Sequence, residues 1–253
     1  MSNFLMQVIV WAVIGLAVFL LCRAMRCKPT LVTLASPKTN AIRAIVAVCL
    51  SATLLFLFIL RHYLVHGPRQ QDFVPTRPAD LVGPLIGLVL FVLPAAVFMF
   101  KNRDPLISVG LTTRNLWQAT AIGTGLAFLT FFFQPGSLAS KVRNFQWVAV
   151  CYYVLVGFQE EFLFRGYLQT RLIAWLGKWQ GWVLASVIMA MVHLPHRLLI
   201  EGKPFGSAIV ASASLVPVSA LMGFIMLQTG NLVAPGMFHT FANLVSTLNR
   251  NTS

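Results

Sequence analysis

Long apolar runs separated by short polar stretches constrain this sequence more than any other feature. Hydrophobic residues make up 58% of the chain and charged residues 10%, whereas a soluble globular domain carries about 25% charged residues. A membrane-spanning helix needs about 20 mostly apolar residues. Eight runs are candidates: Phe4–Leu21, Ala41–Leu60, Leu81–Phe100, Leu116–Phe133, Phe145–Leu163, Trp182–His193, Phe205–Gln228 and Leu232–Leu248. We therefore predict an all-α polytopic membrane protein with about eight transmembrane helices, the fifth of which continues as a helix to Leu176.

The net charge of +13 comes from Lys and Arg residues that lie mostly between the apolar runs. This distribution fits membrane flanks that face anionic lipid, and it lacks the clustered basic patch of a nucleic-acid-binding protein. Arg23, Arg26, Lys28 and Lys38 favour a cytoplasmic first loop with the N-terminus outside. The expected location is the inner membrane of a bacterial cell, or the endoplasmic reticulum of a eukaryotic one.

Two adjacent glutamates interrupt the fifth run. The chain has only six acidic residues, and Glu160 and Glu161 stand side by side among apolar neighbours. Ionisable groups at membrane depth are costly and by default functional. Neighbouring side chains on a helix point about 100° apart, whereas Glu161 and Arg165 are four residues apart and share one face. We expect Glu161 to pair with Arg165, and Glu160 to point elsewhere, toward a cavity.

Further polar residues follow in later runs. His193 ends the sixth run, and His239 and Asn243 share one face of the eighth. With Glu160 they supply a carboxylate, two imidazoles and an amide, which suffices to activate water and to stabilise an oxyanion. Two histidines and one carboxylate also suffice for a catalytic zinc site. A purely structural reading remains open, in which these groups form ion pairs and hydrogen bonds between helices.

The order and spacing of these six residues resemble the CPBP family, which contains the CAAX proteases and bacteriocin-processing enzymes and is also called the Abi family or the type II CAAX prenyl endopeptidases. The run Ile107–Leu111 resembles a short segment often found upstream of the family's core, so the resemblance covers roughly Ile107–Val245. Met189 stands where the family usually has Phe, and Met can fill such a wall position. We expect residues 1–106 to form N-terminal transmembrane helices and residues 107–249 the catalytic core, with its site in the last four helices of one compact membrane domain.

The resemblance implies a glutamate-dependent intramembrane endopeptidase that cuts a membrane-associated or prenylated protein or peptide. In the family the first Glu and the His of the second motif activate water, and here these are Glu160 and His193. The family's oxyanion hole corresponds to His239 and Asn243. Glu161 and Arg165 would support the site. No cofactor is implied, and the oligomeric state stays open.

Three other functions compete with this prediction. A zinc-dependent intramembrane protease could use Glu160, His193 and His239 as ligands, although no HExxH motif is present. A non-catalytic membrane protein, such as an immunity protein, could bind a peptide with the same residues. A proton-coupled transporter could relay protons through Glu and His, but the two halves show no repeat symmetry.

Overall fold

The computed structural model describes residues 3–29, 34–67, 73–133 and 145–250. Within these ranges every regular element is a helix and no strand occurs, which confirms the all-α prediction. The elements are α1 (Asn3–Ala24), α2 (Pro37–His66), η1 (Pro78–Leu81), α3 (Val82–Asn102), η2 (Leu106–Val109), α4 (Leu116–Phe133), α6 (Trp147–Glu161), η3 (Phe162–Gln169), α7 (Thr170–Leu176), α8 (Lys178–Val192), α9 (Leu194–Leu199), α10 (Phe205–Ala213), α11 (Val216–Thr229) and α12 (Val233–Arg250).

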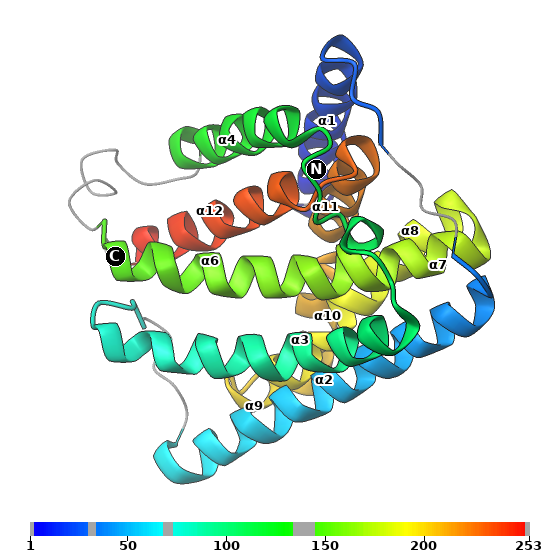
Figure 1. Ribbon diagram of the computed structural model, residues 1–253. Helices are drawn as coiled ribbons and strands as arrows, with labels where there is room; N and C mark the ends of the chain where they lie inside the picture. The colour runs from blue at the N-terminus through cyan, green and yellow to red at the C-terminus, as the bar shows by residue number, and fades with distance from the viewer. Residues whose placement is uncertain (1–2, 30–33, 68–72, 134–144, 251–253) are drawn as a thin grey trace.

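Five long helices lie side by side in the order α2, α3, α6, α12, α4 (Figure 1). Helix α1 packs on α11, and α8 packs between α7 and α11. The largest buried apolar cluster joins α2 and α3 to η3, α7 and α8. The helices that precede residue 106 therefore share a core with those that follow it, and the predicted division at that residue stays a prediction.

Six helical stretches among the described residues are long and apolar enough to cross a membrane. They are Leu5–Ala24, Pro37–Val65, Pro78–Asn102, Trp147–Leu176, Lys178–Leu199 and Phe205–Thr229. The predicted count of eight is not confirmed, because the apolar stretch Leu116–Phe132 is shorter and α12 carries polar residues such as His239, Thr240 and Thr247 along its buried side. The apolar helices indicate a multi-pass membrane protein.

The two glutamates lie in the middle of one long helix. Helices α6, η3 and α7 follow one another without a break over Trp147–Leu176, as the sequence predicted. The stretch η3 is π-helical. Segments of this kind are rare and occur often at functional sites. Here the π-helical stretch begins directly after Glu161 and contains Arg165.

Helices α6 and α12 approach each other closely because two positions carry no side chain. A β-carbon at Gly157 of α6 would lie 2.8 Å from Thr240 Oγ1, and one at Gly236 of α12 would lie 2.8 Å from Phe158 Cε1. Real β-carbons essentially never come so near to another heavy atom. The glycines thus bring the helix that carries Glu160 and Glu161 against the helix that carries His239.

The segment around η2 is held against the same long helix. Arg171 of α7 is fully buried and forms an ion pair of 2.8 Å with Asp104. Its guanidinium also donates to the backbone oxygen and the hydroxyl of Ser108, each at 3.1 Å, and lies 4.2 Å from the centre of the Tyr167 ring. The run 107–111 therefore has a structural role, since it docks on the helix that carries the glutamates.

Candidate active site

Three side chains from three helices converge at Glu160. The Oε2 atom of Glu160 lies 3.7 Å from His193 Nε2 and 3.8 Å from His239 Nε2. This carboxylate oxygen is buried and has no hydrogen-bond partner among the described residues. Residues that the sequence separates by 79 positions are thus brought to one point, with both imidazoles facing the same oxygen.

His193 is oriented by the backbone of its own helix. It follows the last residue of α8, and its Nδ1 lies 2.9 Å from the carbonyl oxygen of Met189. Because a carbonyl oxygen only accepts, Nδ1 must carry the proton. In the neutral ring Nε2 is then unprotonated and faces Glu160. The bond uses the Met189 backbone, so Met in place of Phe at this position leaves it unchanged.

His239 is oriented by the second glutamate. Its Nδ1 lies 2.8 Å from Glu161 Oε1, and the same oxygen lies 3.3 Å from Arg165 Nη1. The Glu161 side chain is fully buried and that of Arg165 is 2% exposed. The predicted pair of Glu161 and Arg165 is therefore present. The contact between Glu161 and His239 was not predicted, because sequence spacing does not reveal which helices touch.

Arg165 extends this chain of contacts to two more helices. Its Nη2 donates to both the backbone oxygen and the hydroxyl of Ser219 in α11, each at 3.1 Å. The Ser219 hydroxyl donates in turn to the backbone oxygen of Ser186 in α8, at 3.1 Å. Sequence reasoning missed both serines, although a small polar residue inside an apolar run is a signal for a contact between helices.

Asn243 is the one predicted site residue that no contact joins to the others in the described part of the chain. It lies one turn after His239 in α12 and is partly buried. Its backbone oxygen accepts a hydrogen bond of 3.1 Å from the Thr247 hydroxyl. The structure thus brings Glu160, Glu161, Arg165, His193 and His239 together and leaves Asn243 at the edge of this group.

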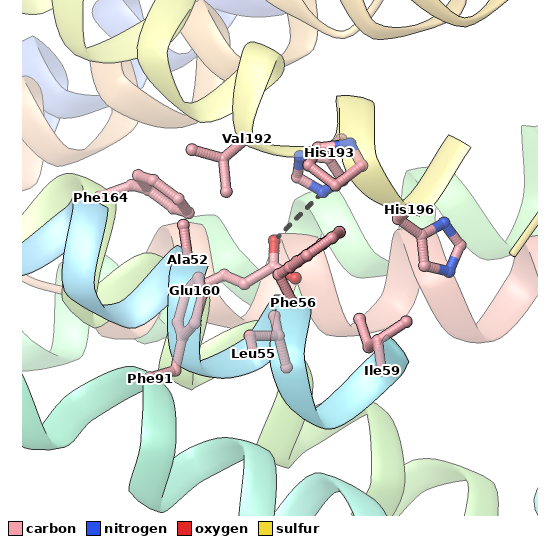
Figure 2. Close-up of a pocket in the computed structure, with 11 residues that line it drawn as sticks. Ala52, Leu55, Phe56, Ile59, Phe91, Glu160, Phe164, Val192, His193 and His196 are labelled. Atoms are coloured by element: carbon pink, nitrogen blue, oxygen red, sulfur yellow. Dashed lines mark ion pairs between the residues drawn. The ribbon is translucent and has the colours of Figure 1, made fainter. Parts of the chain in front are cut away.

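A cavity of about 110 Å³ opens beside Glu160. Figure 2 shows Glu160 pointing toward His193, with Leu55, Phe56 and Ile59 of α2 on the other side of the carboxylate. The lining is mostly apolar and comes from α2, α3, α6, η3, α8 and α9: Ala52, Leu55, Phe56, Ile59, Phe91, Glu160, Phe164, Val192, His193, Pro195 and His196. Helix α2, which lies outside the region of resemblance, therefore shapes the space next to the carboxylate.

A second charged group lies beyond His196, which lines this cavity. Glu201 pairs with Arg197 and Lys203, and its Oε1 is 3.6 Å from His196 Nδ1. Burial alone raises the pKa of Glu201, but the hydrogen bond from Lys203 and the charge of Arg197 outweigh it, so this pKa lies below its ordinary value. Glu201 is therefore a charged ion-pair partner beside the site.

The donor atoms around Glu160 also bear on the zinc alternative. Within the described ranges no group of three His, Cys, Asp or Glu side chains is arranged to hold a metal ion. A catalytic zinc site needs three protein ligands at about 2.0–2.2 Å from the ion. The zinc alternative therefore stays a prediction.

Comparison with known families agrees with the order of motifs. The family model described as type II CAAX prenyl endopeptidase, Rce1-like, matches residues 142–245, a range that contains all six predicted site residues. Comparison with curated proteins and with solved structures finds no match. The matched family is one of proteases, so the match indicates a hydrolase with a substrate at the membrane. Residues 142–245 of this chain thus match the Rce1-like type II CAAX prenyl endopeptidase family, which confirms the predicted resemblance.

Proposed function

We propose that this protein is an intramembrane endopeptidase in which Glu160 and His193 activate a water molecule. The observation that carries the proposal is the position of Glu160 Oε2, which is buried, has no hydrogen-bond partner among the described residues and is faced by two imidazole nitrogens at 3.7 and 3.8 Å. These distances exceed those of direct hydrogen bonds. A water beside the pair can reach both Glu160 and His193, because polar groups at such separations are commonly bridged by water.

In the proposed hydrolysis, Glu160 transfers a proton from the water to the peptide nitrogen. The carboxylate takes one proton from the water, while neutral His193 accepts a hydrogen bond from the other through Nε2. The water oxygen bonds to the carbon of the scissile peptide, whose oxygen becomes an oxyanion. Glu160 returns the proton to the peptide nitrogen as the carbon–nitrogen bond breaks. A new carboxylic acid, which carries the second water proton and then ionises in water, and a new amine leave the site.

The proposed role of His239 requires a doubly protonated ring. Its Nδ1 hydrogen is directed to Glu161, 2.8 Å away, because Glu161 is the partner of Arg165 and accepts only. To donate to an oxyanion, Nε2 must carry a second hydrogen, and the Glu161 carboxylate stabilises that imidazolium. We propose that Asn243 supplies the second donor, since its amide lies one turn further along the same helix.

The substrate of this reaction is proposed to enter the apolar cavity beside Glu160. The lining residues of α2, α3 and α8 leave little polar surface apart from the reacting groups. A membrane-associated or prenylated segment fits this environment better than a soluble loop does, because its side chains lose no hydration there. We propose such a peptide bond, near the membrane, as the one that is cut.

Comparison of protein termini in the membranes of cells with wild-type protein and cells with Glu160→Gln identifies the substrate. We expect at least one terminus that is cut with the wild-type protein and stays uncut with Glu160→Gln and with His193→Gln. Glu201→Gln is the matched control, because it makes the same change outside the reacting group. Identical sets of termini in wild-type and Glu160→Gln cells, together with an unchanged cellular effect, would favour the non-catalytic binding function.

Zinc dependence is the second mechanism to test, because both imidazoles lie within 4 Å of the Glu160 carboxylate. We expect the purified protein to cut its substrate at the wild-type rate after dialysis against a chelator, with less than stoichiometric metal by elemental analysis. Activity that disappears with the metal and returns with added zinc would replace the proposed mechanism by a metal-dependent one.

A further inference from the structure

A second hollow lies at the end of α3, away from the glutamates' cavity. Its volume is about 690 Å³. The lining consists of apolar residues from α3, η2 and η3 together with three charged ones: Ala96, Met99, Phe100, Lys101, Arg103, Asp104, Leu106 and Phe162. Neither the site described above nor the family match assigns a ligand to this groove.

The groove crosses the end of a predicted membrane span. The span Pro78–Asn102 ends between Lys101 and Arg103. Phe100 is 86% exposed and Leu106 is 62% exposed, so apolar surface is open on both sides of the basic residues. Basic residues next to apolar surface at the end of a span are typical of the depth at which phospholipid headgroups meet acyl chains.

The charge that the groove presents is positive. Asp104 is the single acidic residue of the lining, and it forms an ion pair of 2.8 Å with Arg171. Lys101 and Arg103 are exposed and form no ion pair within the described part of the chain. Arg43 adds a further cation nearby, since it donates to Asn102 Oδ1 at 2.7 Å. An anion in the groove would therefore meet two free cations and no free carboxylate.

The same end of the protein also carries the first loop. The backbone N–H of Lys28 donates to Asn115 Oδ1 at 3.2 Å, which connects the basic first loop to the segment after the groove. The sequence predicts that this loop is cytoplasmic, where the leaflet contains anionic lipids. The predicted side of the membrane therefore favours a negatively charged lipid as the occupant of the groove.

We propose that this groove binds an anionic phospholipid of the bilayer. The phosphate lies against Lys101 and Arg103, and an acyl chain covers Phe100 and Leu106. Phe162, which follows Glu161 directly, forms part of the groove wall. A bound lipid therefore touches the helix that carries the candidate active site, although its binding does not depend on the proposed hydrolysis.

The test is lipid retention by full-length purified protein in detergent, measured by native mass spectrometry with equal amounts of phosphatidylglycerol and phosphatidylcholine. The variant K101Q/R103N removes both charges. Asn suits position 103 because Arg103 has a φ of 55°, and Asn tolerates that left-handed conformation. The matched control is R23Q/R26N, since Arg26 has a φ of 53° and the pair lies at the end of another helix, α1.

We expect wild-type protein to retain phosphatidylglycerol in preference to phosphatidylcholine. K101Q/R103N should lose retention by on the order of 10- to 30-fold, from about 1 kcal/mol for each basic residue near the headgroups, while R23Q/R26N stays near wild type. Unfolding temperatures of both variants show that the fold is kept. Unchanged retention in K101Q/R103N, or an equal loss in both variants, would overturn the proposal. Displacement of the lipid by millimolar inorganic phosphate would also overturn it, because the groove would then be a site for a free anion.

Discussion

Arg165 and Arg171 lie on the same long helix, and both are almost fully buried. Each pairs with a carboxylate, Arg165 with Glu161 and Arg171 with Asp104. Each also donates to the hydroxyl and the backbone oxygen of a serine. By charge, burial and hydrogen bonding alone, the two networks could not be told apart.

The networks differ in what the carboxylate touches next. Glu161 contacts His239, which faces Glu160, whereas Asp104 borders the groove at the end of α3. A buried ion pair in a membrane helix is therefore not by itself a sign of catalysis. What distinguishes the first network is its direct contact with an imidazole that faces a carboxylate oxygen without a hydrogen-bond partner among the described residues.

The largest expected difference between the networks is in activity. The double variant Glu161→Gln with Arg165→Met removes both charges, and with them the carboxylate that stabilises the imidazolium of His239, so we expect a loss of at least about 100-fold in kcat/KM. Asp104→Asn with Arg171→Met removes the other pair and should keep most of the activity. Rates on the identified substrate in the same lipid decide this. Equal losses in the two double variants would show that the comparison is wrong.

Single substitutions should lower the stability of the protein to a similar extent in the two networks. Arg165→Met or Arg171→Met leaves a buried carboxylate without its cation, which typically costs about 3–5 kcal/mol of stability. We expect both to lower the unfolding temperature clearly, and each double variant to recover part of the loss, because removal of both charges leaves none unpaired. Stability that does not change in either single variant would mean that these pairs contribute little.

A glycine substitution at the contact between α6 and α12 should lower stability and activity more than one on the surface of α4. Gly157→Ala places a methyl group 2.8 Å from Thr240 Oγ1, and overpacking of this kind typically costs about 1–3 kcal/mol. It also moves Glu160 relative to His239, so activity should fall with stability. Gly125→Ala in α4 is the control, since no atom lies within 4 Å of its β-carbon, and it should be neutral or stabilising. Thermal unfolding and rates of the two variants provide the measurement.

The smallest effect is expected at Glu201, outside both networks. Partly exposed ion pairs contribute about 0–1 kcal/mol, so Glu201→Gln should lower the unfolding temperature only slightly and leave the rate unchanged. Because its pKa is lowered in the folded state, its contribution is present above the unfolded pKa and is lost as the pH falls through the folded one. Thermal unfolding of wild type and variant across acidic pH measures this. A difference that grows at low pH would contradict the sign.

The fold class and the pairing of Glu161 with Arg165 could be predicted because each follows from spacing along one helix. Apolar runs give helices, and an i,i+4 spacing puts two side chains on one face. The contact of His239 with Glu161, by contrast, depends on the close approach that Gly157 and Gly236 allow between distant segments. The network of Arg171 was missed for the same reason, since its partners lie 63 and 67 positions earlier in the chain.

The central claim is that Glu160 acts in the chemistry while Glu161 holds the site together. The most direct test is Glu160→Gln, measured for kcat/KM and for thermal unfolding in one lipid preparation. The account predicts a loss of at least about 100-fold in rate and an unfolding temperature equal to that of wild type, because Glu160 Oε2 has no hydrogen-bond partner to lose among the described residues. A variant that cuts at the wild-type rate, or one that loses activity only by unfolding, would contradict it.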